Sequence, residues 1–184
     1  MTIPLSRVLC LSGAMLATVA TAQTPPIKPG LWQMQSTRLV DGQPAPDPMA
    51  QLKSLPPESR ARMEQMLKQQ GVDIGGNGTS RICLSPESFE RNTWQGGQHD
   101  CKTDFQSRTG NRWTWKSSCT QPPSESEGEA VFANPENYTV KHHLKMQRQG
   151  QVRTSDMTVK AKWLGADCGD LKPAAPPAKP APQK

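Results

Sequence analysis

Residues 112–119 read Arg-Trp-Thr-Trp-Lys-Ser-Ser-Cys, and large apolar residues alternate with polar ones along the first half of this stretch. Successive side chains of a β-strand point to opposite faces, so this alternation predicts a strand with one buried and one solvated face. Trp113, Trp115 and Cys119 share the face that we expect to be buried. Two tryptophans and a cysteine on one face predict a core wall that a disulfide fastens.

The preceding residues, 101–111, supply a partner strand and a Thr-Gly-Asn turn. Two registers are open for this hairpin. A two-residue turn would put Arg108 beside Trp113, whereas a three-residue turn pairs Phe105 with Trp115. A slip of one residue moves every side chain of a strand to the opposite face. We favour the three-residue turn because it keeps the apolar side chains together.

The first 22 residues have the pattern of an export signal. Arg7 gives a positive start, residues 8–19 are apolar, and Ala-Thr-Ala at 20–22 is a small-x-small cleavage site. The apolar run is too short and too rich in small residues for a good membrane span. We therefore expect an exported chain that begins at Gln23 and has no transmembrane span after cleavage.

Cys10 leaves with the signal, and an even number of cysteines remains. The favoured hairpin register puts Cys101 opposite Cys119, which leaves Cys83 to pair with Cys168 by elimination. The rival pairing, Cys83–Cys101 with Cys119–Cys168, stays open. Disulfides are typical of exported domains. No Cys-x-x-Cys pair and no suitably spaced histidine occurs, so we expect disulfides and no metal site.

The remaining pattern predicts a single, mainly β domain over residues 23–171. Residues 172–184, rich in Pro, Ala and Lys, predict a disordered tail. The expected fold is a curved antiparallel sheet or partial barrel with a short α-helical insertion. About seven strands are expected, at residues 31–40, 79–84, 101–108, 112–119, 128–132, 138–147 and 152–164.

Residues 44–78 form the insertion, which is rich in Pro, Gln and Met. Pro57 suits the first turn of a helix and Gly71 suits its end. Met63, Met66 and Leu67 make a narrow apolar stripe on that helix. We expect a flap over one face or end of the sheet. A methionine stripe favours apolar packing or partner binding over a copper(I) site.

Tight turns after residues 132 and 147 fix registers for the last three strands that keep the apolar side chains on one face. These registers put His143 on the opposite face, between Glu127 and Asp156. The alternatives are an acid–base dyad and a ladder of surface charge pairs, and we favour the ladder. His142 faces inward and is expected to be a core histidine.

Five short stretches stand out by their order along the chain: Lys-Pro-Gly-Leu-Trp at 28–32, Cys-Leu-Ser-Pro-Glu at 83–87, Gly-Asn at 110–111, Cys-Thr at 119–120 and Trp-Leu-Gly-Ala-Asp-Cys-Gly at 163–169. Together they resemble a bacterial exported family catalogued as a domain of unknown function (number thirty-six seventeen). The resemblance covers residues 28–172 and implies a small periplasmic, β-rich, four-cysteine domain, with no activity and no ligand attached.

The formal net charge of +6 is mild, so we expect no nucleic-acid partner. No serine–histidine–acid order, phosphate loop or metal-spaced carboxylate set stands out, so we expect neither catalysis nor a cofactor. The alternatives to a binding module are an envelope enzyme, with His99, His142 and His143 as its candidate bases, and a purely structural, stress-related protein.

The leading hypothesis is a non-catalytic binding or interaction module of the cell envelope. Its ligand would be an apolar small molecule or a segment of an envelope protein, held between the concave face of the sheet and the flap. The expected ligand residues are the large side chains on these two surfaces: Trp32, Phe105, Trp113, Trp115, Tyr138 and Trp163 on the concave face, and Met63, Met66 and Leu67 on the flap.

Overall fold

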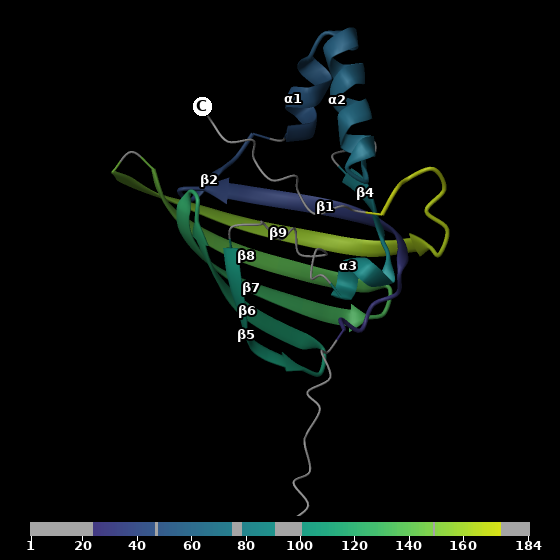
Figure 1. Ribbon diagram of the computed structural model, residues 1–184. Coiled ribbons are helices and arrows are strands. Elements are labelled where there is room, and N and C mark those ends of the chain that lie inside the picture. Colours follow the sequence, from purple (N-terminus) through teal and green to yellow (C-terminus); the bar gives the residue numbers. More distant parts are fainter. Residues whose placement is uncertain (1–23, 47, 75–78, 91–100, 149, 174–184) are drawn as a thin grey trace, which may run out of the picture.

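The structure is a computed structural model that describes residues 24–46, 48–74, 79–90, 101–148 and 150–173. Within these residues, nine antiparallel strands form one sheet in the order β3-β4-β1-β9-β8-β7-β6-β5, with β2 beside β1 (Figure 1). The elements are β1 (Gly30–Val40), β2 (Gln43–Pro44), α1 (Pro48–Ser54), α2 (Pro57–Gln69), β3 (Val72–Ile74), β4 (Thr79–Leu84), α3 (Pro86–Glu90), β5 (Cys101–Thr109), β6 (Arg112–Thr120), β7 (Pro123–Asn134), β8 (Asn137–Arg148) and β9 (Gln151–Gly165).

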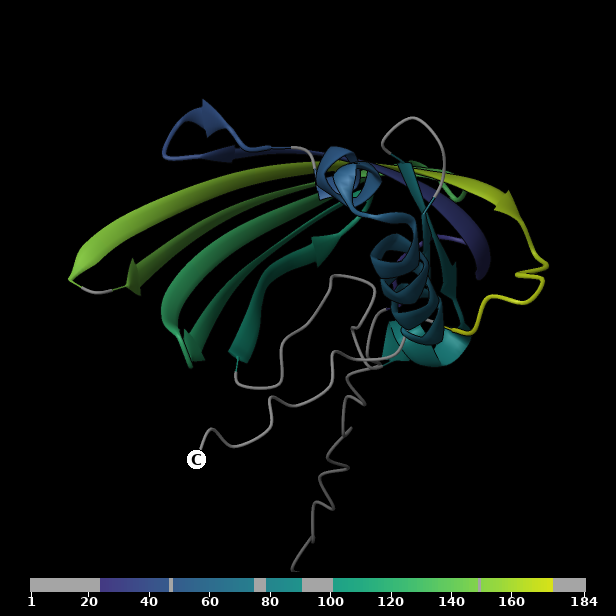
Figure 2. The same cartoon turned by 90° about the horizontal axis from the view of Figure 1, so that it is seen from above.

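The prediction of a mainly β, curved antiparallel sheet is confirmed, and each of the seven predicted strands is present. The sheet bends into an open arch with a concave and a convex face (Figure 2). It does not close into a barrel, because β3 and β5 lie at its two ends. The two additional strands, β2 and β3, are short and flank the helices of the insertion. The signal predicted over residues 1–22 and all but the start of the tail predicted over 172–184 lie outside the described residues.

Strand β7 is longer than predicted, because it begins at Pro123 instead of residue 128. Its first half reads Pro-Ser-Glu-Ser-Glu, which has a low intrinsic preference for strand. Pairing on both sides overrides that preference: Ser126 lies opposite Ser117 of β6 and Leu144 of β8. The sheet therefore extends well beyond the region that apolar residues mark in the sequence.

The β5–β6 hairpin combines the two candidate registers. Its turn has two residues and puts Arg108 opposite Trp113, so the predicted three-residue turn is wrong. A β-bulge at Gln106 then adds one residue to β5, and Phe105 lies opposite Trp115 as predicted. A bulge shifts the register by one position and so restores the alternation that the turn alone would break.

Both disulfides of the favoured pairing are present. Cys101–Cys119 links β5 to β6, with 4.0 Å between the Cα atoms. Cys83–Cys168 links β4 to the segment after β9, with 5.7 Å between the Cα atoms and 85 residues of separation. The second bond ties β4 to the residues just after the end of the last strand, as elimination predicted.

One half of the concave face is a packed aromatic core, which we call the aromatic half. Its rings form a chain in which Trp32 contacts Tyr138, Tyr138 contacts Phe132, and Phe132 contacts Trp113, with centroids 5.0, 6.1 and 5.4 Å apart. Helix α3 lies on this side of the sheet (Figures 1 and 2). Side chains from residues 24–29, which precede β1 and which we call the entry segment, from the end of β4 and from α3 complete the core: Ile27, Leu84 and Phe89.

The insertion does not cover the tryptophan face. Helices α1 and α2 project from the β1–β4 side of the sheet (Figure 1), and α2 packs mainly on β3. The side chains of Met63 and Met66 are exposed, and Leu67 is only half-buried. The stripe is too narrow and too poorly apolar to draw the helix onto the sheet, so it remains a projecting helical hairpin.

Candidate functional site

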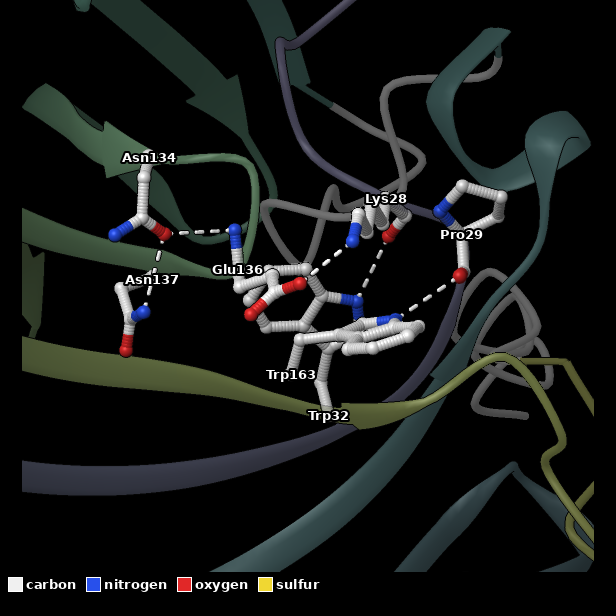
Figure 3. A network of polar contacts seen from close by, with 7 residues as sticks. All are labelled: Lys28, Pro29, Trp32, Asn134, Glu136, Asn137 and Trp163. Carbon is white, nitrogen blue, oxygen red and sulfur yellow. Dashed lines mark hydrogen bonds and ion pairs between the residues drawn. The ribbon is translucent and has the colours of Figure 1, made fainter.

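The entry segment forms a clamp at the aromatic half (Figure 3). The indole Nε1 of Trp32 donates to the carbonyl of Lys28 at 3.0 Å, and that of Trp163 donates to the carbonyl of Pro29 at 3.1 Å. The Lys28 ammonium lies 2.5 Å from a Glu136 carboxylate oxygen and 4.7 Å from the centre of the Trp163 ring. The polar atoms of both indoles are thereby occupied by the protein itself.

The clamp requires a glycine at position 30. Its φ of +131° favours glycine, and a Cβ atom there would lie 2.2 Å from the carbonyl oxygen of Gly165. The backbone can therefore pass close to β9 only if this residue has no side chain. The Lys-Pro-Gly-Leu-Trp stretch is thus a structural lock that holds the entry segment against the sheet.

The predicted ligand face divides into parts with different roles. Trp32, Trp113 and Tyr138 are at most 2% exposed, and they belong to the core. Phe105 and Trp163 pack against that core while staying partly buried. The structure does not bring the flap residues Met63, Met66 and Leu67 to these rings, so the predicted composite of face and flap is wrong. Of the predicted residues, Trp115 alone also lines the hollow described next.

No described segment packs over the other half of the concave face, and we call it the open half. A hollow of about 320 Å³ lies there. Its floor is apolar, and its far wall carries the small hydroxyls of β5, β6 and β7 together with the Cys101–Cys119 disulfide. The residues of the floor are Trp115, Val140, Leu144, Met146 and Met157.

A second hollow of about 460 Å³ adjoins the first and shares Leu144 and Met146 with it. Arg38 and Arg153 line its outer part, toward β1 and β9. The two hollows form one trough along the open half of the concave face. Its shared apolar side chains are half-buried, so they are neither core nor ordinary surface.

The trough residues were not predicted from the sequence, although the predicted strand registers place them correctly. The registers predicted for β7, β8 and β9 are confirmed, and they put Leu144 and Met146 on the inner face with Ser155 and Met157. These residues resemble ordinary core positions of a strand, because no local signal shows whether a distant segment covers them. They differ from core positions because α3, which is distant from them in the sequence, packs on the aromatic half.

The two neighbouring histidines serve different faces. His142 lines the trough, and burial, with a smaller effect from the charge of His143, lowers the pKa of His142 below its ordinary value. His143 lies on the convex face with its Nδ1 2.6 Å from an Asp156 oxygen. They therefore do not form one catalytic pair. His99, the remaining candidate base, lies outside the described residues.

The convex face carries charge pairs, of which the predicted contact between His143 and Asp156 is one. Lys116 lies 2.9 Å from Glu127 and Arg112 lies 2.9 Å from Glu129, beside the His143–Asp156 pair. The pKa of Lys116 is raised and that of Glu127 is lowered, in each case chiefly by the hydrogen bond between them. These exposed pairs satisfy one another, and each contributes little to stability.

Arg108 is a residue that the favoured register had turned away from the rings. The two-residue turn places its guanidinium 3.5 Å from the centre of the Phe105 ring and 5.5 Å from that of Trp113. Its Nε is buried without a hydrogen-bond partner among the described residues. The stacking on aromatic faces provides the compensation that hydrogen bonds do not.

No group of three His, Cys, Asp or Glu side chains in the described ranges is arranged to hold a metal ion. No helix within the described ranges is both long enough and apolar enough to cross a bilayer.

Comparison with known proteins identifies the family. Residues 27–168 match the family model described as "Protein of unknown function (DUF3617)". A Pseudomonas putida protein described as "Uncharacterized protein in lpd-3 5'region" is 39% identical over 140 residues, which cover 73% of this chain and 95% of that protein. No solved structure gives a significant match. The chain belongs to the DUF3617 family of proteins of unknown function.

Proposed function

We propose that this protein is an exported, non-catalytic binding module that holds an apolar ligand in the trough of its concave face. The observation that carries the proposal is the open half itself: Leu144, Met146 and Met157 line one hollow on the sheet and are half-buried. Contiguous apolar surface of this kind, rimmed by polar groups, is typical of binding sites.

The dimensions and chemistry of the trough support a small ligand. Each hollow, of about 320 and about 460 Å³, falls within the range of small-molecule sites, roughly 300–1,000 Å³. Two of the central side chains are methionines, whose flexible thioethers adapt to ligands of different shape. A floor of this composition favours aliphatic chains over a single rigid molecule.

The same lining supports a binding role over an enzymatic one. Catalysis by side chains needs a group positioned to transfer a proton or attack, with a partner that orients it. His142 is the histidine of the trough, and no carboxylate lines either of the two hollows within the described chain. An apolar floor with one lone histidine suits retention of a ligand.

Two features support location in an oxidising compartment. The Cys83–Cys168 and Cys101–Cys119 disulfides are typical of proteins outside the cytosol. The export pattern of residues 1–22 agrees with that location. We propose the periplasm, where a module of this size could carry apolar molecules between membranes or proteins.

The test uses a neutral apolar dye, N-phenyl-1-naphthylamine, whose fluorescence rises in apolar surroundings. We expect the wild-type protein to bind it and the Leu144→Gln/Met157→Gln variant to bind roughly tenfold more weakly, because two apolar contacts are lost. The matched control, Met63→Gln/Met66→Gln on α2, should bind as the wild type does. Circular dichroism checks that all three proteins are folded. Loss of binding in the α2 variant with retention in the trough variant would refute the proposal and move the site to the insertion.

A further inference from the structure

The two faces of the sheet differ in their charges, because the convex face carries side chains of both signs and the concave face does not. In the seven long strands, the registers and burial pattern assign each side chain to one face. The carboxylates of these strands all lie on the convex face: Asp104, Glu125, Glu127, Glu129 and Asp156.

The concave face carries charge of one sign. Among the side chains that the structure describes on that face, the charged ones are the arginines Arg38, Arg108 and Arg153. Arg108 stacks on aromatic rings in the aromatic half. The other two line the trough. An apolar trough whose charged rim is positive favours a ligand that carries a negative group.

Arg153 is already neutralised. Its guanidinium lies 2.6 Å from a carboxylate oxygen of Asp41, in the turn after β1. The other oxygen of Asp41 accepts a hydrogen bond from the backbone N–H of Thr154 at 2.8 Å. These contacts lower the pKa of Asp41, with the Thr154 hydrogen bond first and Arg153 second. The carboxylate therefore stays ionised and holds Arg153 to the rim.

Among the described residues, Arg38 has no such counter-ion. Its Nε donates to the hydroxyl of Ser155 at 2.8 Å, which orients the guanidinium but leaves its charge uncompensated. No acidic group forms an ion pair with it within the described part of the chain. It lines the same hollow as Leu144 and Met146, so an oriented, unneutralised guanidinium stands at one end of an apolar floor.

We infer that the trough binds a single-chain anionic amphiphile whose carboxylate pairs with Arg38 and whose aliphatic chain lies along Leu144, Met146 and Met157. This inference rests on the proposed function, because it assigns the ligand class of the same trough. A planar guanidinium binds a carboxylate through two parallel hydrogen bonds. One uncompensated arginine matches one negative charge, which favours a carboxylate over a phosphate monoester.

The experiment measures how well dodecanoate and dodecan-1-ol displace the dye at pH 8, where dodecanoate is ionised. We expect dodecanoate to bind the wild-type protein roughly tenfold more tightly than the alcohol, as a charge-assisted pair implies. Arg38→Gln should abolish that preference and leave alcohol binding unchanged. The matched control Arg112→Gln removes an arginine from the convex face and should retain the preference.

The outcomes separate this inference from the proposed function. Equal binding of dodecanoate and dodecan-1-ol to the wild type, or equal weakening of dodecanoate by Arg38→Gln and Arg112→Gln, would overturn the assignment of the headgroup while the apolar trough stands. Tighter binding of dodecyl phosphate than of dodecanoate would overturn the carboxylate. Failure of the dye and of both chains to bind would overturn the proposed function together with this inference.

Discussion

In the aromatic half of the concave face, Trp32 is 0% and Phe132 is 2% exposed, whereas Leu144 and Met157 in the open half stay half-buried. Both halves lie on the same strands and follow the same alternation of side chains. The difference is that the entry segment and α3 return over one half and leave the other uncovered. The comparison shows that a strand pattern decides which face is apolar, while a distant segment decides whether that face is core or site.

The largest expected difference between the halves is in stability. Trp32→Ala should lower the free energy of unfolding by about 3–5 kcal/mol, because it leaves a cavity in a packed core. Leu144→Ala should cost about 1 kcal/mol, because that side chain is already partly in water. Urea unfolding of the two variants measures both values. Equal losses would mean that the open half is as well packed as the aromatic half.

A smaller effect is expected where the two halves meet, at Gly128. A Cβ atom there would lie 2.1 Å from the Trp115 ring, so Gly128→Ala must displace the indole that forms part of the trough floor. We expect a loss of roughly 1–3 kcal/mol from overpacking. Denaturant unfolding, with indole fluorescence as the probe, tests this.

Gly165→Ala is the matched control for that substitution. A Cβ atom at Gly165 meets nothing within 4 Å, so the stability should change by no more than about 0.5 kcal/mol. If Gly128→Ala lowers the stability no more than Gly165→Ala does, the Trp115 ring moves freely. The floor of the trough would then be adaptable at its aromatic end.

The smallest expected effect is a pH dependence of the unfolding free energy, which comes from His142 in the open half. Burial lowers the pKa of His142 in the folded state below the value of 6.5 that it has when unfolded. The unfolded chain therefore binds more protons as the pH falls through 6.5, and this group makes the protein less stable toward acid. The stability that this lowered pKa contributes is fully present above pH 6.5 and is lost below the folded-state pKa.

The variant His142→Gln isolates that contribution. We expect the difference in unfolding free energy between pH 7.5 and pH 5.5 to be smaller in the variant than in the wild type, measured by urea unfolding at both values. The His143→Gln variant on the convex face serves as the comparison. An unchanged pH difference in His142→Gln would show that the imidazole is solvated well enough to titrate as it does in the unfolded chain.

Much of the fold could be predicted because it is encoded locally. Tight turns and period-two alternation gave the correct registers for β7, β8 and β9, and through them the outer position of His143. The favoured disulfide pairing was predicted from the β5–β6 hairpin, where a bulge compensates for a turn shorter than the predicted one. The bulge at Gln106 could not be predicted, because one extra residue satisfies the alternation as well as a longer turn does.

The candidate site was harder to predict than the fold. Large aromatic side chains such as Trp113 suggested a ligand face, yet size alone favours burial, and the chain covers them. The trough depends on smaller side chains, Leu144 and Met157, which no distant segment among the described residues covers. The position of α2 was equally undetermined, because its weak apolar stripe does not specify a surface on which to pack.

The Cys83–Cys168 bond has a consequence for how a protease would divide this protein. The bond closes a covalent ring that contains α3 and all strands from β5 to β9. A single cut anywhere between residues 84 and 167 would leave the two pieces attached until the bond is reduced. Strand β1 lies outside the ring, although it sits between β4 and β9. A cut in the projecting α1–α2 hairpin would release β1 from every covalent tie to the ring, and only the hydrogen bonds and packing of the sheet would hold it in place.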